Sequence, residues 1–313
     1  MTQQIRLIVN PAAGGGTAEQ AVPEIERVLR ELGVPHDLVH TERPWHAAEL
    51  ARQAVRDDVD VVVAVGGDGT GNEVLNGLME AKLAGEGTAA MGFLSVGRGN
   101  DFAFGAGAPA AVAEECAALA ADRRHWIDVG YVEGDGVERA RYFGNGIGIG
   151  FDAVVGFEAA KLKRLRGFPG YLVAALRTIF LFFRAPLTRI EYNDETLEQR
   201  SLMVSVMNGR RMGGGFMMAP EAEIDDGLLD LCIAKKVSKI GVLFLITKFM
   251  KGNQASRPSI TTGRTERITV TALDGALPAH ADGETLCVEG SRLSMKILPR
   301  QIEIVGRPSR EAA

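Results

Sequence analysis

The chain has 313 residues, of which 46% are hydrophobic and 38 are glycines, and its formal net charge is -5 at pH 7. This length favours two domains, and the composition excludes disordered and fibrous proteins in favour of a packed α/β or α+β protein. The negative net charge excludes a general attraction to nucleic acid, and no DNA- or RNA-binding motif occurs. We therefore expect no nucleic-acid partner.

Three widely spaced cysteines, Cys116, Cys232 and Cys287, fit neither a disulfide framework nor a CxxC metal site. They favour a reducing, cytoplasmic setting. The first residues lead directly into an apolar strand, so no signal peptide is expected. The most apolar stretch, 168–183, contains Arg177 and is too short to cross a bilayer comfortably. A soluble, cytoplasmic protein is the expectation.

Strand-like and helix-like patterns alternate over residues 1–128. Thr17 and Gln20 predict a capping box at the start of the first helix, and Gly33 predicts its end. The apolar, β-branched run 59–65 is typical of a parallel strand buried on both faces. The other strands are expected at 5–9, 38–40 and 91–96, and the other helices at 47–55 and 72–81. This alternation predicts a parallel sheet of βαβ units that binds ligands at the strands' carboxyl ends.

Short strand patterns separated by Gly, Asp and Pro turns dominate residues 129–313. They are expected at 189–192, 202–207, 228–234, 267–271, 293–297 and 302–305, with helices around 154–184 and 238–251. The predicted fold class is therefore a Rossmann-like three-layer nucleotide domain, 1–128, and a largely antiparallel, β-sandwich-like domain with inserted helices, 129–313. The last strand, near 300–306, is a candidate to return to the first domain.

The strongest local motif is the run Gly66, Gly67, Asp68, Gly69 and Thr70, between the buried strand and a helix. Glycines let a backbone turn sharply and approach a phosphate, whose charge amide hydrogens and the positive helix end stabilise. A carboxylate at the centre of the run suits a magnesium ion held between it and the phosphate. The alternative is a tight turn with a solvated aspartate. No GxxxxGK[ST] loop occurs, so a P-loop NTPase is not indicated.

This run, followed by Asn72, Glu73, Asn76 and Gly77, resembles the GGDGT-x-NE-x-x-NG motif of the diacylglycerol kinase catalytic domain family, which includes sphingosine and ceramide kinases. GGDGT alone is shared with NAD kinases and resembles a phosphofructokinase loop. Four further segments resemble that family's landmarks in the same order, namely 9–15 (NP-x-[SA]-G), 97–103 (G-T-x-NDFA), 224–230 (DDG-x-[LF]-D of the bacterial branch) and 282–284 (DGE). The resemblance thus covers nearly the whole chain.

The resemblance implies a site for ATP and Mg²⁺ in which Asp68 helps to hold the catalytic metal. The implied nucleotide-binding residues are Asn10, Pro11, Ala12, Ala13, Gly14, Thr41, Gly66, Gly67, Asp68, Gly69, Thr70, Gly71, Asn72, Glu73, Gly97, Arg98, Asn100 and Asp101. Arg98 departs from the family, which often has threonine there, although an arginine can also pair with a phosphate. Asn100 and Asp101 have an alternative role, which is to cap the short helix that follows.

The resemblance also implies that the late DGE segment supplies the general base that accepts the proton of the lipid hydroxyl. We favour Glu284 as this base, with Asp282 as its orienting partner or competitor. The alternative for this Asp-Gly pair is a bare β-turn. A second, structural magnesium site is implied at Asp226 and the backbone carbonyls of Glu223 and Leu228. The alternative there is a hairpin turn.

Residues 159–190 contain no acidic residue but many basic and bulky apolar ones. The basic residues are Lys161, Lys163, Arg164, Arg166, Arg177, Arg184 and Arg189. Such a segment fits an anionic bilayer surface, and the alternative is a helical hairpin packed on the β-rich domain. We therefore expect peripheral association with the inner face of the membrane.

The function expected from the sequence is an ATP-dependent lipid kinase that phosphorylates diacylglycerol to phosphatidic acid in the cleft between its two domains. An NAD-kinase-like enzyme that phosphorylates a soluble nucleotide would explain GGDGT but not the 97–103 segment. A non-catalytic lipid- or nucleotide-binding scaffold would have lost Asp68, Asp282 and Glu284, all of which are present. A homodimer paired through an edge strand is a further possibility.

Overall fold

The computed structural model describes residues 3–97, 99–161, 173, 177–179 and 184–306. The chain forms two compact units. Unit 1 comprises Met1–Val129 and Pro299–Ala313, and unit 2 comprises Gly130–Leu298. The sequence predicts a division between residues 128 and 129, with the last strand as a candidate to return to the first domain. Two long strands, β5 (Arg124–Gly134) and β15 (Arg292–Val305), contribute residues to both units.

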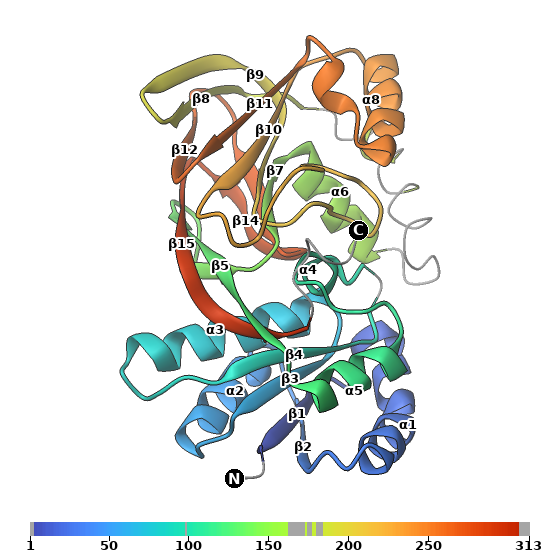
Figure 1. Ribbon diagram of the computed structural model, residues 1–313. Helices are drawn as coiled ribbons and strands as arrows, with labels where there is room; N and C mark the ends of the chain where they lie inside the picture. Colours follow the sequence, from blue (N-terminus) through green and yellow to red (C-terminus); the bar gives the residue numbers. More distant parts are fainter. Residues whose placement is uncertain (1–2, 98, 162–172, 174–176, 180–183, 307–313) are drawn as a thin grey trace. The chain divides into compact units, whose positions relative to one another are not determined.

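Unit 1 is built on a parallel sheet in the order β4-β3-β1-β2, flanked by helices on both faces (Figure 1). Its strands are β1 (Ile5–Val9), β2 (His36–His40), β3 (Val61–Gly66) and β4 (Ala90–Ser95). Its helices are η1 (Ala13–Gly15), α1 (Thr17–Glu31), α2 (His46–Arg56), α3 (Asp68–Leu83), α4 (Asp101–Gly105) and α5 (Val112–Ala121). Apolar side chains of α1 and α5 share one core with one face of the sheet. The predicted three-layer α/β fold is confirmed.

Two local predictions for unit 1 are corrected by the structure. The N-cap of α1 is Gly16, with a φ of 95° and no side-chain cap, so Thr17 is already helical and the predicted capping box does not form. Helix α3 begins at Asp68 and not at residue 72, so three of the five residues of the predicted loop, 66–70, are helical. Glycines at 69 and 71 hid this early start, because glycine disfavours a helix interior.

Unit 2 is an antiparallel β-sandwich, as the fold class predicted. Its other strands are β6 (Arg141–Phe143), β7 (Gly146–Gly150), β8 (Leu187–Tyr192), β9 (Glu195–Met207), β10 (Leu229–Lys235), β11 (Ile260–Thr265), β12 (Arg267–Ala272), β13 (Leu277–Ala281) and β14 (Glu284–Gly290). Strand β9 joins the two sheets, because its first half pairs with β8 and its second half with β7 and β10. Helices α6 (Phe151–Lys161), α8 (Lys239–Lys251) and η2 (Gln254–Ser256) are added to the strands.

The two strands predicted at 293–297 and 302–305 are one continuous strand, β15. Pro299 lies inside it, and Arg300 has a φ of 50°. Arg300 N–H donates to Asp128 Oδ1 at 2.7 Å, so the kink is anchored on β5. In unit 1 the end of β15 pairs in parallel with β4 through Ile304 and Met91.

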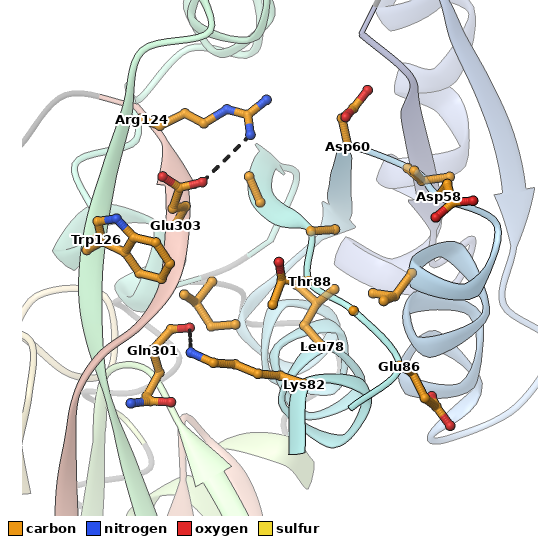
Figure 2. Close-up of a pocket in the computed structure, with 16 residues that line it drawn as sticks. Asp58, Asp60, Leu78, Lys82, Glu86, Thr88, Arg124, Trp126, Gln301 and Glu303 are labelled. Carbon is orange, nitrogen blue, oxygen red and sulfur yellow. Dashed lines mark hydrogen bonds and ion pairs between the residues drawn. The ribbon is translucent and has the colours of Figure 1, made fainter. Parts of the chain in front are cut away.

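Side chains of α3 and β5 hold this returning strand (Figure 2). Lys82 Nζ donates to the Gln301 carbonyl at 2.6 Å, and Arg124 pairs with Glu303 at 3.7 Å. Burial lowers the pKa of Lys82, whose ammonium group lies 5.6 Å from the ring centre of Trp126. These residues line a cavity of about 330 Å³ beside the residues where β3 and β4 begin. Ligands of open α/β sheets bind at the opposite, carboxyl ends of the strands.

The motif residue Gly77 sets the distance between α2 and α3. A β-carbon on Gly77 would lie 2.1 Å from the carbonyl oxygen of Ala48, whereas one on Gly71 would lie 3.4 Å from the Phe93 ring. We expect Gly77→Ala to reduce the free energy of unfolding by about 2 kcal/mol or more, because backbone must move. Gly71→Ala, the matched control in the same helix, should be neutral or stabilising by up to about 1 kcal/mol. Denaturant unfolding measures both, and equal effects would contradict this account.

Candidate active site

Three loops meet at the carboxyl ends of β1, β3 and β4, where the sequence predicted a phosphate site. Asn10 Nδ2 donates to Thr70 Oγ1 at 3.1 Å, and Asn10 N–H donates to the Val65 carbonyl at 3.0 Å. On the other side, Val96 N–H donates to the Gly66 carbonyl at 2.8 Å. The predicted residues of these three segments therefore come together in unit 1.

The β1 loop folds back on itself beside the other two. Ala12 N–H donates to Asn10 Oδ1 at 3.1 Å, and Pro11 lies between these two residues. Gly14 has a φ of 62°, and η1 contains both Ala13 and Gly14. Thr41, which follows β2, joins this edge because its N–H donates to the Val9 carbonyl at 2.8 Å.

Glycine is needed where the second and third loops touch. A β-carbon on Gly97 would lie 2.4 Å from the Cα atom of Gly67, so no other residue fits at position 97 without moving the backbone. A β-carbon on Gly66 would lie 2.4 Å from Thr70 Oγ1. This close approach leaves backbone, and not side chains, at the surface that a phosphate would meet.

The amino-terminal end of α3 lies within this group of loops. Asp68, Gly69 and Thr70 form its first turn, and the N-cap residue Gly67 offers no side-chain acceptor. The first four N–H groups of a helix lack intrahelical partners, and the helix dipole makes this end positive. A helix of 16 residues starting at a glycine-rich loop is thus a suitable phosphate site.

Two carboxylates converge at this helix end. A β-carbon built on Gly99 would lie 2.9 Å from Asp68 Oδ2 and 3.1 Å from Asp101 Oδ2. Asp68 also uses Oδ1 to accept Phe102 N–H at 3.0 Å, which caps α4 from the first turn of α3. Carboxylate oxygens are preferred ligands of hard divalent cations such as Mg²⁺. The two side chains therefore fit a magnesium ion that phosphate oxygens would help to bind.

The other predicted nucleotide-binding residues differ in their contacts within unit 1. Asn100, with a φ of 53°, is the N-cap residue of α4 but makes no side-chain cap. Glu73 Oε2 accepts Ala47 N–H at 3.1 Å at the start of α2, so this side chain stabilises a neighbouring helix. Asn72 is buried, and its carbonyl accepts Asn76 Nδ2 at 2.8 Å. Arg98 lies outside the described residues.

Glu115, on α5, is a buried carboxyl group near these loops that the sequence reading did not single out. Its Oε2 accepts the N–H of Ser95, the last residue of β4, at 2.7 Å. The residue is 1% exposed, and Oε1 has no hydrogen-bond partner among the described residues. Burial raises the pKa of Glu115 above its ordinary value. No sequence signal distinguished this glutamate from the exposed Glu114 beside it.

We expect Glu115→Gln to raise the thermal unfolding midpoint at neutral pH, because it removes a buried charge and keeps an oxygen for Ser95 N–H. A carboxyl group whose pKa is raised by folding destabilises the folded state once the pH exceeds its unfolded-state pKa. The gain should therefore vanish at low pH, grow from the unfolded-state pKa up to the folded-state pKa, and stay constant above it. Thermal unfolding from about pH 4 to about pH 8 tests this, with Glu114→Gln as the control. A gain that is independent of pH would contradict it.

In unit 2 the predicted DGE segment forms the turn between β13 and β14. Asp282 and Gly283 have φ values of 48° and 85°, and Ala281 pairs with Glu284. Two consecutive positive φ values in a two-residue hairpin are those of a type I′ turn, which favours Asp-Gly. The β-turn named above as the alternative for this Asp-Gly pair is thus present. It gives the carboxylates of Asp282 and Glu284 different surroundings.

Asp282 is buried and accepts three backbone hydrogen bonds. Its Oδ1 accepts the N–H groups of Asn145 and Gly146 at 2.9 and 2.8 Å, and its Oδ2 accepts Gly144 N–H at 2.8 Å. Glu284 is exposed at the first position of β14. Asp282 therefore ties the turn to the segment before β7, while the Glu284 side chain faces solvent.

His280, on β13, contacts this turn and was not singled out by any sequence pattern. Gly283 N–H donates to its Nδ1 at 3.2 Å, and its Nε2 lies 3.7 Å from Asp152 Oδ2. The His280 and Asp152 side chains are 2% and 9% exposed. Asp152 also lines, with apolar side chains of α6, β9 and α8, a small cavity of about 40 Å³. Unit 2 thus has a buried polar pair next to an apolar slot.

The predicted second metal site is an acidic group that surrounds one arginine. Leu228 N–H donates to Asp226 Oδ1 at 3.0 Å, and Asp226 Oδ2 lies 3.6 Å from Arg264. Burial raises the pKa of Asp230, the nearby charge of Arg264 opposes this, and the charges of Asp226 and Glu223 add to it. Asp230 Oδ2 is buried without a hydrogen-bond partner among the described residues. Such a set of oxygens fits a hard cation.

Neither group of acids completes a metal site with side chains alone. Within the described residues, no cluster of three or more His, Cys, Asp or Glu side chains could hold a metal ion. Phosphate oxygens in unit 1, and backbone carbonyls in unit 2, would have to supply the remaining ligands. The segment 208–228 that carries the second group is a long connection between β9 and β10, and not the hairpin turn that was its alternative.

Much of the basic stretch 159–190 lies outside the described residues, including Lys163, Arg164 and Arg166. The described part contains ion pairs. Arg177 lies 3.6 Å from Glu158, and Arg189 donates to Glu198 at 2.7 Å.

Comparison with known proteins assigns both halves of the chain. The family description "Diacylglycerol kinase catalytic domain" matches residues 4–132. The description "YegS C-terminal NAD kinase beta sandwich-like domain" matches residues 145–306. The chain is 31% identical over 303 residues to a protein named "Probable lipid kinase YegS-like" from Enterobacter sp. (strain 638), covering 95% of this chain and 93% of the relative.

Further relatives and solved structures agree with this. A diacylglycerol kinase of Staphylococcus saprophyticus is 26% identical over 285 residues, which are 91% of this chain and 90% of the relative. A crystal structure described as a diacylglycerol kinase from Bacillus anthracis str. Sterne superposes with a TM-score of 0.74 at 21% identity, covering 98% of both chains. An NAD kinase of Archaeoglobus fulgidus in complex with ATP gives 0.54 at 14% identity, covering 97% and 93%. These structural likenesses show the fold.

Proposed function

This chain belongs to the diacylglycerol kinase catalytic domain family, and from that premise we propose that it transfers the γ-phosphate of ATP to the hydroxyl group of a membrane lipid. The lipid that we propose is diacylglycerol, which would yield phosphatidic acid. Two of the compared relatives are named a lipid kinase and a diacylglycerol kinase, which supports this choice.

The observation that carries the proposal is the convergence of Asp68 and Asp101 at the amino-terminal end of α3. The helix end and the stacked glycine loops would bind the ATP phosphates through backbone N–H groups. The two carboxylates would hold Mg²⁺, which neutralises charge on the transferring phosphoryl group when it is bound. A site at the carboxyl ends of the strands without these carboxylates could bind nucleotide but would not favour transfer of the phosphoryl group.

We propose Glu284 as the general base for the lipid hydroxyl. Asp282 already accepts three backbone N–H groups, so both of its oxygens are used by the fold. Glu284 projects from the same turn and is exposed, so it can accept a proton from a hydroxyl group within hydrogen-bond reach. Asp282 then fixes the turn that carries the base, and His280 supports it through Gly283 N–H.

The slot beside Asp152 is too small, at about 40 Å³, to hold a lipid chain, but its apolar lining favours a lipid acceptor over a soluble nucleotide. Apolar side chains of α6 and α8 line it, and its one acidic residue could orient a hydroxyl group. Within the described residues, no helix combines the length and the hydropathy that a membrane span needs. We propose that the protein works in the cytoplasm and meets its substrate at the inner surface of the membrane.

Transfer of labelled γ-phosphate from ATP and Mg²⁺ to lipids in mixed micelles tests the proposal. The acceptors are diacylglycerol, monoacylglycerol, sphingosine and ceramide, with NAD as the soluble acceptor. Labelled phosphatidic acid is the expected product. Label in another lipid would support a lipid kinase with a different substrate. Label found only in NADP would instead identify an NAD kinase. Absence of transfer by protein that still binds ATP would refute catalysis.

A further inference from the structure

The outer face of α8 is the most concentrated exposed apolar surface among the described residues. The described residues include nine exposed large hydrophobic side chains, and four of them, Ile240, Leu243, Phe244 and Met250, lie on this one helix. Ile240 is 68% exposed and Phe244 is 63% exposed. At 100° per residue the four positions fall within an arc of about 120°. The outer face of α8 is therefore an apolar stripe, interrupted by the exposed Thr247 and by the end residue Lys251.

The inner face of the same helix is already used by the core. Val242, Leu245, Ile246 and Phe249 are buried and pack with Phe151 and other residues of unit 2. Figure 1 shows α8 (orange) at the outer side of the strands of unit 2. Packing within unit 2 thus accounts for one face of α8, and the opposite apolar face has no partner among the described residues of that unit. An unpartnered apolar stripe on a folded helix indicates an interaction surface.

The segment of the chain that carries α8 has charged residues of one sign only. Residues 231–265 contain no acidic residue, in a chain whose net charge is -5. The basic residues of this segment are Lys235, Lys236, Lys239, Lys248, Lys251, Arg257 and Arg264. Lys239, Lys248 and Lys251 belong to the helix, and Lys239 and Lys251 are its end residues. The apolar stripe is therefore bordered by flexible, positively charged side chains.

We propose that the outer face of α8 docks this protein on the anionic surface of a membrane. The four apolar side chains would enter the boundary between head groups and acyl chains, and the lysines would contact lipid phosphates. Protein–protein interfaces are depleted in lysine, whereas membrane-surface helices are rich in it. A symmetric pair of this chain through α8 would bring two lysine-rich segments together, which is unfavourable. Charge thus favours lipid over a second copy.

This docking role rests on the proposed lipid kinase function, because it explains how the enzyme would reach a substrate that stays in the bilayer. The inner face of α8 lines the apolar slot beside Asp152 through Val242, Leu245, Ile246 and Phe249. One helix would then contact the membrane with its outer face while its inner face borders the slot.

Sedimentation with vesicles tests the docking without any turnover. The full chain is mixed with vesicles of phosphatidylcholine alone or of equal parts phosphatidylcholine and phosphatidylglycerol. We expect binding to the anionic vesicles and a roughly tenfold or greater loss in the Ile240→Ser/Phe244→Ser variant. The matched control is Leu32→Ser/Leu83→Ser, which removes two exposed leucines of unit 1 at the carboxyl ends of α1 and α3. Lys248→Glu/Lys251→Glu should abolish the preference for phosphatidylglycerol.

Two further measurements separate docking from catalysis and from self-association. Each variant is assayed for phosphoryl transfer to a short-chain diacylglycerol dispersed in detergent, where wild-type rates are expected. Anionic vesicle binding that is unchanged in Ile240→Ser/Phe244→Ser would overturn the docking proposal even if the kinase is active. If the wild-type protein binds vesicles but phosphorylates no lipid, the lipid kinase proposal is refuted and the docking proposal stands. A dimer in solution that only the α8 variant disrupts would identify a self-association face instead.

Discussion

Replacing Asp68 by asparagine should lower kcat for phosphoryl transfer by about a thousandfold or more and leave the free energy of unfolding nearly unchanged. Asparagine keeps an oxygen that can accept Phe102 N–H, which Asp68 Oδ1 accepts at 3.0 Å, so the cap of α4 survives. The charge that would face Mg²⁺ beside Asp101 is lost. Steady-state transfer of labelled phosphate to diacylglycerol, together with denaturant unfolding, measures the two effects separately.

Two further variants locate the cause of this loss. Asp68→Ala removes both the charge and the cap, so it should add a destabilisation of about 1 kcal/mol to the same loss of turnover. Glu73→Gln is the control within the same motif, because Glu73 serves the N-terminus of α2 through Ala47 N–H. Its turnover should stay within about threefold of wild type. Wild-type turnover in Asp68→Asn would eliminate the metal role, and a large loss in Glu73→Gln would mean that the motif binds nucleotide farther along α3.

Glu284→Gln and Asp282→Asn, two residues apart, should fail in different ways. Glu284→Gln should lower kcat by about a hundredfold to ten-thousandfold and leave stability and ATP affinity unchanged, because an exposed base contributes to the chemical step alone. Asp282→Asn should reduce the free energy of unfolding by about 2 kcal/mol. In the wild-type protein, both oxygens of Asp282 accept backbone N–H groups. Asparagine has only one acceptor oxygen, so its NH₂ group would face at least one backbone N–H group and leave it without an acceptor.

Thermal unfolding and single-turnover kinetics, carried out on both variants and on Val288→Thr as an exposed control on β14, distinguish the two effects. The informative comparison is made below the midpoint of the less stable variant, where both chains are folded. If folded Asp282→Asn turns over as slowly as Glu284→Gln, the turn itself positions the base. If Glu284→Gln keeps wild-type kcat, Glu284 is not the base and another group must accept the proton.

The central features of unit 1 could be predicted from the sequence because local pattern determines them. The β-branched run that ends in Gly66 has few alternatives to a buried strand, and β3 spans Val61–Gly66. The start of α3 was misplaced by four residues, since glycine propensity opposed a helix that the loops around it stabilise. In unit 2, β7 reads GIGIG and β13 reads LPAHA, and the glycines of β7 and the proline of β13 disfavour strands in the sequence pattern.

Within the candidate site, residue types were predictable and roles were not. The partners of Asp282 lie 136 to 138 residues away in the chain, so no spacing along the sequence could distinguish a buried anchor from a base. Glu73 and Gly77 stand in the same motif as Asp68 but serve the packing of α2. Glu115 became visible only through its burial.

The pairing of β15 with β4 has a consequence for how the protein is made. Unit 1 takes its last strand from residues after Pro299, which leave the ribosome after all of unit 2. Until then β4 is an open edge of the nascent sheet, with unpaired N–H and C=O groups along its outer side. Chains that end prematurely keep that edge exposed, and they are the species most prone to recruit a foreign strand. Completion of unit 1 thus requires that translation has passed all of unit 2 and reached the end of β15.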